Sequence, residues 1–157
     1  MKIDTVWGIF PVFLIDIPIS SSAQGTTNAC VIRLKYNKDP KESLIVYLHE
    51  RVHVKQFYAM MLAVGLSVAL AAFISMWFLL AVGIILLWWV TPHAEYCKET
   101  AAYAETARQY VSLGEDKDDI ITTVARIFDN SYLYRENKTF DQIRARIETR
   151  FYDKRIF

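Results

Sequence analysis

The sequence predicts a single-domain α+β protein over residues 1–157, with N-terminal strands, a helical body and a membrane-inserted segment. Three observations lead to this fold class. Val, Ile and Phe fill residues 3–19, with prolines between them, which is typical of short antiparallel strands near a sheet edge. Helix-start signals stand at Asp39 and Thr91. Residues 59–90 carry no charged side chain, and uncharged runs beyond about 18 residues indicate membrane insertion.

The N-terminal third is predicted to hold the strands. Residues 20–28, with the sequence SSSAQGTTN, are predicted to form a loop from their composition. Apolar and polar residues alternate over residues 29–36, which indicates a half-exposed strand. Asp4, Pro11 and Asp16 interrupt the apolar N-terminus, which disfavours a secretion signal. We therefore expect the soluble part of this membrane protein to be cytoplasmic.

Two helices have clear start signals. Asp39 is predicted as the N-cap of the first helix, with proline at the next position and Glu42 placed for a capping box. That helix continues without a breaker into the apolar run. Thr91 is predicted as the second N-cap, again followed by proline, and the helix extends to about Leu113, where Gly114 provides a stop.

Residues 115–157 are predicted to be a helical C-terminal extension. Apolar residues recur there at helical spacing, and Thr139 with Gln142 forms a capping-box pattern. The net charge of +1 gives no argument for nucleic acid as a partner. Cys30 and Cys97 form no C-x-x-C pair, and we interpret them as small buried or interfacial thiols.

A zinc-binding motif lies on the first helix. His49 and His53 are four residues apart, so both project from one face and could share one Zn²⁺. Glu50 lies beside them, where its carboxylate could take a proton from a metal-activated water and pass it to a leaving amine. This is the HExxH arrangement of metallopeptidases. The alternative is a chance match of a short motif.

A catalytic zinc needs a third protein ligand, and the second helix carries the candidates. We choose Glu99 as that ligand. Tyr103 lies one turn later on the same face and could donate its hydroxyl to a ligand or to a developing oxyanion. Three further residues stay open as alternatives for the third ligand: His93, Glu95 and Glu105.

The stretch HERVHVKQ resembles the HExxHxxQ helix of small, membrane-associated zinc metallopeptidases of the gluzincin class from bacteria and phages. In these proteins a hydrophobic stretch follows the motif, and a later helix carries a glutamate followed by Ala-Tyr. Residues 99–105, ETAAYAE, are similar to that second element. The resemblance implies that His49, His53 and Glu99 are zinc ligands and that Glu50 is the general base.

A shared zinc site requires the apolar run to turn back on itself. A single span over residues 59–90 would be about 48 Å long, against a hydrocarbon core of ~30 Å, and would put the histidines and Glu99 on opposite sides. We therefore predict a helical hairpin that turns within residues 71–77. Aromatic residues would then line one membrane interface, namely Phe57, Tyr58, Trp88 and Trp89.

The functional prediction is a zinc metallopeptidase that hydrolyses a peptide or protein near a lipid bilayer. The strand at residues 29–36 is expected to border the site and to hold an extended substrate by main-chain hydrogen bonds. A second class of protein remains open as an alternative. The chain could be a non-catalytic, single-span membrane anchor or interaction protein, of a kind that a phage could encode. A third alternative is a soluble subunit whose apolar run forms a dimer interface.

Overall fold

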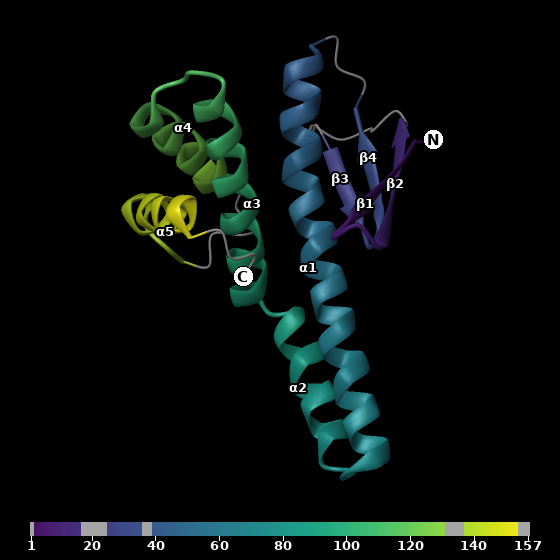
Figure 1. Cartoon of the computed structure of the whole chain (residues 1–157). Coiled ribbons are helices and arrows are strands. Elements are labelled where there is room, and N and C mark those ends of the chain that lie inside the picture. The colour runs from purple at the N-terminus through teal and green to yellow at the C-terminus, as the bar shows by residue number, and fades with distance from the viewer. Residues whose placement is uncertain (1, 17–24, 36–38, 131–136, 154–157) are drawn as a thin grey trace.

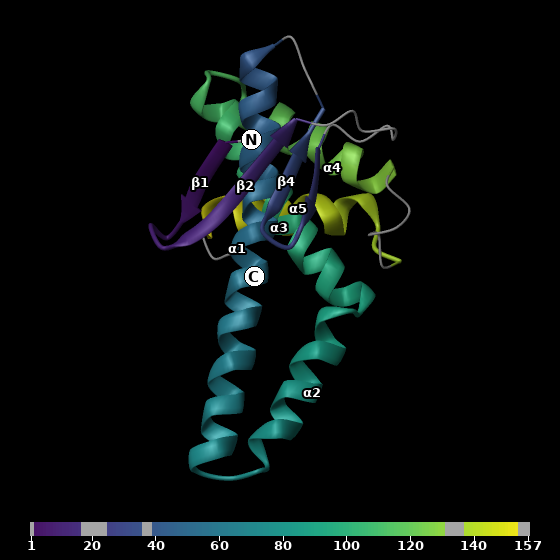
Figure 2. The ribbon, with the colours of Figure 1, turned by 90° about the vertical axis from the view of Figure 1, so that its right-hand side faces the viewer.

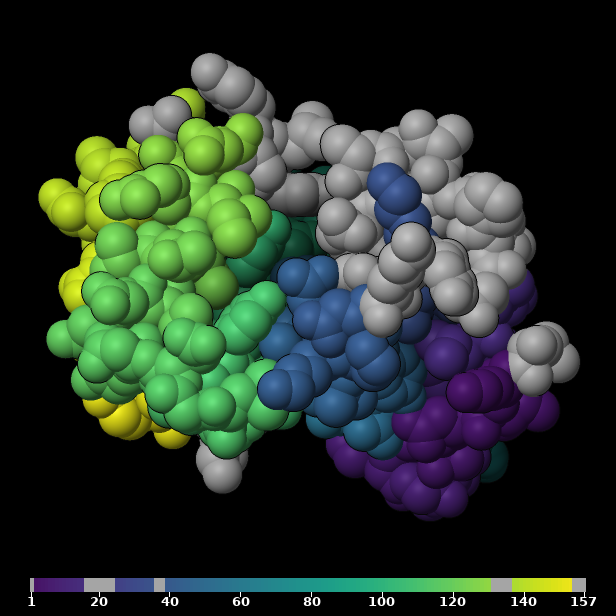
Figure 3. Space-filling view, turned by 90° about the horizontal axis from the view of Figure 1, so that it is seen from above, coloured from purple at the N-terminus to yellow at the C-terminus, as the bar shows by residue number. Residues whose placement is uncertain are grey.

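A computed structural model of the chain describes residues 2–16, 25–35, 39–130 and 137–153. Within these residues the fold is α+β, with one four-stranded sheet and five helices (Figure 1). The sheet lies against the first half of a long helix, and three other helices gather on the opposite side of that helix. Seen from above, the strands and the C-terminal helices flank the long helix as two lobes (Figure 3).

The sheet contains β1 (Lys2–Val6), β2 (Phe10–Asp16), β3 (Gly25–Asn28) and β4 (Val31–Leu34) in the spatial order β1-β2-β4-β3. β1 pairs antiparallel with β2, β2 pairs parallel with β4, and β4 pairs antiparallel with β3. Alternate strand side chains face the long helix and pack with its Val54 to form the buried core of this lobe; the strand members are Val6, Val12, Ile32 and Leu34.

Two expectations about the strands need correction. β4 is an inner strand, so the strand predicted at residues 29–36 does not provide a free edge, and its last residue, 36, lies outside the described part. Residues 25–28 form the edge strand β3, although their composition predicted a loop; residues 20–24 lie outside the described part. β3 forms because Gly25 fits closely against the long helix, where a Cβ would lie 2.7 Å from Val46 Cγ1.

Pro11 lies in β2, which is also an inner strand rather than the expected edge strand. Its missing N–H is tolerated because β4 pairs with β2 only from Phe13 onward, so Pro11 faces β1 alone through Thr5. Its carbonyl accepts a hydrogen bond from the Tyr58 hydroxyl at 2.7 Å. Pro18 lies outside the described residues.

The long helix α1 spans Pro40–Phe73, with the predicted N-cap Asp39, while the capping box with Glu42 stays a prediction. The Asp39 side chain caps it by accepting a hydrogen bond from the Lys41 N–H at 2.8 Å, and proline occupies the first turn. No residue of α1 after Gln56 is buried. The N-terminal half therefore packs between two lobes, and the C-terminal half projects beyond them (Figures 1 and 2).

The chain reverses direction after α1. Helix α2 (Phe78–Trp89) runs back beside the projecting half of α1, and α3 (Pro92–Ser112) follows after a bend of 68° (Figure 2). Thr91 caps α3 as predicted, accepting from the Ala94 N–H at 3.2 Å. Lys98 holds the bend, because its Nζ lies 4.3 Å from the Trp89 ring centroid. α3 thus packs along the first half of α1.

The C-terminal helices α4 (Lys117–Asn130) and α5 (Phe140–Tyr152) pack against α3. The capping box of Thr139 and Gln142 at the start of α5 is present in both directions, as predicted. The Arg108 guanidinium joins α3 to the end of α5 through the carbonyls of Arg150 at 2.6 Å and Phe151 at 3.0 Å. This extension thus forms one core with α3, including Phe128, Ile143 and Ile147.

Candidate metal centre

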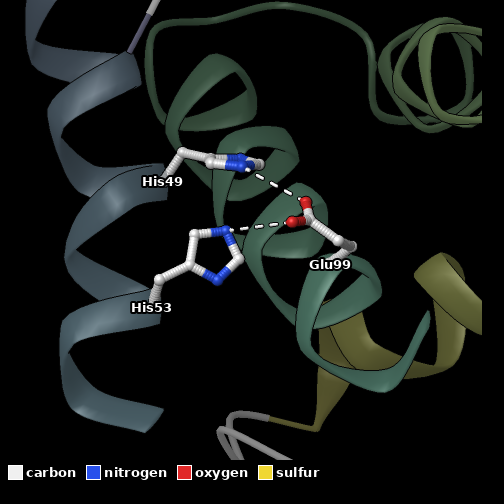
Figure 4. A group of neighbouring side chains, drawn as sticks. All are labelled: His49, His53 and Glu99. Carbon is white, nitrogen blue, oxygen red and sulfur yellow. Dashed lines mark ion pairs between the residues drawn. The ribbon is translucent and has the colours of Figure 1, made fainter. Parts of the chain in front are cut away.

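Three side chains from two helices converge at the middle of the helical body. His49 and His53 project from α1 toward α3, and Glu99 projects from α3 toward them (Figure 4). One ligand atom from each lies within 4.8 Å of the others. His49 Nε2 is 3.7 Å from Glu99 Oε2, and His53 Nε2 is 3.5 Å from Glu99 Oε1. Within the described residues, this is the group that could hold a metal ion.

The spacing of the three side chains is compatible with a shared metal ion. Ligands at 2.0–2.2 Å from a tetrahedral Zn²⁺ are about 3.4 Å from one another. The two measured nitrogen-to-oxygen distances are close to that value. Charge-assisted hydrogen bonds are shorter, at about 2.7–2.9 Å. Two imidazole nitrogens and a carboxylate also form a donor set that zinc prefers.

The other ring nitrogen of each histidine has a defined partner. His49 Nδ1 lies 3.1 Å from Thr106 Oγ1, and that hydroxyl donates its one proton to the Ala102 carbonyl at 3.2 Å. The hydroxyl oxygen therefore accepts a hydrogen bond from the imidazole. In a neutral imidazole, protonation of Nδ1 leaves a lone pair on Nε2, which faces Glu99.

Gln56 acts on His53 in the same way. Its Nε2 donates to the Lys98 carbonyl at 3.1 Å, which turns its Oε1 toward His53 Nδ1 at 3.1 Å. Gln56 is fully buried between α1 and α3. Its amide thus ties the two helices together and leaves His53 Nε2 free to bind a metal.

The charge of Glu99 suits a ligand. Burial raises the pKa of Glu99, but a polar interaction with His49 and the nearby charges of His53, His49 and Lys98 together lower it below its usual value. The carboxylate is therefore ionised at neutral pH. Its side chain is 13% exposed, so a bound cation would be partly shielded from water.

The alternative ligands lie in other contacts. Glu95 pairs with Lys98, and Glu105 pairs with Arg108 and accepts from Gln109 Nε2 at 2.7 Å. His93 lies 3.6 Å from the sulfur of Cys97. None of the three belongs to the group around the histidines. Cys30 and Cys97 are free thiols, half-buried and buried respectively.

The Glu50 side chain projects from α1 toward the edge strand β3, while the histidines project toward α3 (Figure 4). It is 8% exposed and contacts β3, where the Thr27 hydroxyl donates to Glu50 Oε2 at 2.7 Å. A Cβ at Gly25 would lie 3.0 Å from Glu50 Oε1. The edge strand therefore fixes the position of this carboxylate.

Tyr103 lies between the candidate centre and the C-terminal core. Its ring is edge-on to His49, with centroids 4.9 Å apart, and edge-on to Phe128 at 5.5 Å. The ring thus supports His49 from the side of α4. The predicted role of its hydroxyl stays a prediction.

Sequence reasoning missed three residues that position the site, Gly25, Thr27 and Thr106, and it recognised Gln56 only as part of the HExxHxxQ pattern, without a role. Gln56 carried a signal, because its spacing of three residues from His53 places it on a neighbouring part of the same helix face. Thr106 carried a weaker one, being seven residues after Glu99 on α3. The β3 residues gave none, because their contact with α1 depends on the tertiary fold.

No family model, curated protein or solved structure matches this chain.

Proposed function

We propose that this protein is a zinc-dependent metallopeptidase anchored in a membrane by a helical hairpin. The observation that carries the proposal is the convergence of His49, His53 and Glu99, with both Nδ1 atoms held by acceptors so that both Nε2 atoms face one point. The HExxH motif that contains the histidines is typical of metallopeptidases. The resemblance of HERVHVKQ and of residues 99–105 to small gluzincin-type peptidases also supports this proposal.

The chain would hold the metal through His49, His53 and Glu99. A Zn²⁺ bound there would polarise a scissile carbonyl and lower the pKa of a water. The Glu50 carboxylate would accept the proton of the attacking water and deliver it to the leaving amine nitrogen, as the C–N bond breaks. Thr27 would orient that carboxylate by its hydrogen bond to Oε2. We assign two roles to Tyr103: its ring supports His49, and its hydroxyl would donate a hydrogen bond to a developing oxyanion.

An extended substrate would lie along β3. This strand pairs with β4 on one side, and within the described residues no strand pairs with its other edge. It also contacts Glu50 through Thr27. A peptide added at this edge would make main-chain hydrogen bonds and pass the proposed base. The role that the sequence suggested for residues 29–36 is thus moved to β3.

The membrane anchor would consist of the second half of α1 together with α2. α1 is long and apolar enough to cross a membrane. Large apolar side chains are exposed over both helices and the turn between them, among them Leu66, Phe73, Trp77, Leu80 and Leu87. Exposure of such an apolar surface to water is unfavourable, and the hydrocarbon chains of a bilayer would cover it.

The hairpin would enter the bilayer without crossing it. α2 has 12 residues and is about 18 Å long, which is shorter than the ~30 Å of hydrocarbon, and residues 56–73 of α1, which carry no charge, are about 27 Å long. Part of the backbone at the tip is hydrogen-bonded, as an apolar phase requires. Ile74 N–H donates to the Leu70 carbonyl at 2.9 Å, and the Ser75 hydroxyl accepts from the Trp77 N–H at 3.4 Å.

The packing of α3 along the first half of α1 favours this hairpin over a single tilted span. A single span would separate β1 and α3 by the bilayer. Cysteines introduced at two exposed positions, Ile3 and Leu113, test this in sealed vesicles. The hairpin predicts that an impermeant reagent labels both sites from the same side. Labelling from opposite sides would support the non-catalytic anchor. Release by a wash without detergent would support the soluble subunit.

Catalysis is tested with a mixed library of unstructured peptides read by mass spectrometry. The full chain in detergent micelles, loaded with Zn²⁺, should cleave peptides. Glu50→Gln should keep the metal and lose cleavage, whereas His49→Ala should lose both. Glu95→Gln is the matched control, since this carboxylate pairs with Lys98 and should leave cleavage unchanged. Cleavage by the Glu50→Gln variant would refute the assignment of the base.

A further inference from the structure

The turn between β1 and β2 has an unusual composition for a tight turn. Trp7 and Gly8 both have positive φ, at 52° and 72°, and the Ile9 N–H donates to the Val6 carbonyl at 3.3 Å. Turns with two such residues favour Asn, Asp and Gly. A tryptophan in the left-handed region is a conformational outlier. Such outliers occur where a side chain is needed for function.

The side chains at this turn are exposed and apolar. Trp7 is 48% exposed, and Ile9 is 77% exposed. From Thr5 to Ile15 the chain carries no charge. A hairpin tip in water would ordinarily carry polar residues. The tip therefore resembles a surface that meets an apolar or interfacial phase.

The turn lies at the level where α1 leaves the body. Phe10 stacks on Tyr58 with ring centroids 4.6 Å apart, and the Tyr58 hydroxyl donates to the Pro11 carbonyl. Tyr58 lies three residues after Lys55, the last charged residue of α1. The turn is at the end of the sheet that faces the projecting half of α1 (Figures 1 and 2). A bilayer around the hairpin would thus reach the neighbourhood of the turn.

We infer that the β1–β2 turn, residues 7–9, is a second membrane contact that inserts Trp7 and Ile9 into the lipid headgroup region. This inference rests on the membrane part of the proposed function. Tryptophan favours that region, because its ring is apolar and its N–H can hydrogen-bond there. Contact at both the hairpin and the turn would restrict rotation about α1. The lobe that carries β3 would then keep a fixed orientation toward the bilayer.

The test uses single-cysteine variants of the full chain, in a background with Cys30→Ser and Cys97→Ala. Each variant carries an environment-sensitive fluorophore and is reconstituted in phosphatidylcholine vesicles. Lipids with a nitroxide near the headgroup serve as quenchers. Ile9→Cys probes the turn. Ile3→Cys is the matched control, since it is 64% exposed on the same hairpin but distant from the turn. Leu80→Cys, in α2, reports insertion of the proposed anchor.

We expect the probe at position 9 to be quenched at least about twofold more than the probe at position 3, because interfacial contacts lie within 5–10 Å of the headgroups. Equal quenching at positions 3 and 9, with strong quenching at position 80 by deeper nitroxides, would overturn this inference alone. No quenching at position 80 would refute the anchor and the turn contact together.

A second variant tests the tryptophan itself. Trp7→Asn places a residue that tolerates positive φ in the turn, so folding should not suffer. Quenching at position 9 should fall by about half, because the aromatic contact with the interface is lost. Unchanged quenching would remove Trp7 from the proposed contact.

Discussion

Gln56 offers a sharp test of the candidate metal centre, because this residue binds no metal itself. The substitution Gln56→Met keeps the length and approximate volume of the side chain and removes its hydrogen bonds to His53 Nδ1 and to the Lys98 carbonyl. His53 would lose the contact that orients its ring. Outer contacts of this kind change metal affinity by about 10–100-fold. We expect a loss of zinc affinity in that range.

The same substitution should have a modest effect on stability. The Lys98 carbonyl keeps its place in the hydrogen-bond ladder of α3. A hydrogen bond contributes about 0.5–1.5 kcal/mol net, so two lost bonds predict a decrease of about 1–3 kcal/mol in the free energy of unfolding. The folded protein would remain dominant, and its zinc affinity could be measured.

The assay is competition for Zn²⁺ with a chromophoric chelator in detergent. Gln109→Met is the matched control, because it removes an amide that contacts Glu105 and neither histidine. The control should keep the affinity of the wild type. If Gln56→Met binds zinc as tightly as the control does, His53 is not oriented by this amide, and the proposed design of the site is wrong.

Three further predictions concern the surroundings of the site. Thr106→Val should weaken zinc binding about 10-fold, whereas Thr106→Ser should retain it, since only the hydroxyl contacts His49. Gly25→Ala should lower the free energy of unfolding by about 1–3 kcal/mol in denaturant titrations, because its Cβ would overlap the α1 face, whereas Gly65→Ala has open space and should not. Tyr47 donates a hydrogen bond to Asp4, and this bond lowers the pKa of Asp4 below its ordinary 3.8. Burial, and to a smaller extent the same hydrogen bond, raises the pKa of Tyr47 to about 12. The ionised Asp4 contributes stability that is present above pH 3.8 and is lost as the pH falls through its folded-state pKa. The difference in the free energy of unfolding between wild type and Tyr47→Phe should therefore become smaller in acid.

Each of these has a clear contradicting result. Equal zinc affinities for the Val and Ser variants at position 106 would show that the hydroxyl does not orient His49. Equal unfolding curves for the two alanine variants would show that β3 does not pack tightly on α1. A stability difference at position 47 that stays constant between pH 7 and pH 3 would exclude Asp4 as the titrating partner.

The sequence predicted the starts of the helices because their signals are local. Asp39, Thr91 and Thr139 each cap a helix through side-chain contacts within three residues. The same local chemistry gave the wrong result for β3, where Gly25 and the threonines after it read as a loop. Their strand conformation depends on pairing with β4 and on contact with α1, which the local sequence does not encode.

The residues of the candidate site also divide into those that the local sequence predicts and those that depend on tertiary packing. The spacing of His49 and His53 follows from one helix and could be read directly. Glu99 could be chosen only as one of several candidates, because its approach to the histidines depends on how α3 packs on α1. The contacts from Gln56 and Thr106 needed the three-dimensional structure, since each spans the gap between these two helices.

The central claim is that His49, His53 and Glu99 hold one zinc ion. The most direct measurement is the metal content per chain of protein purified in detergent with metal supplied, read by mass spectrometry that identifies the element. The account predicts about one zinc per chain in the wild type and in the Glu95→Ala control, with clear loss in Glu99→Ala. A wild-type protein without bound metal, or an unchanged zinc content in Glu99→Ala, would contradict it.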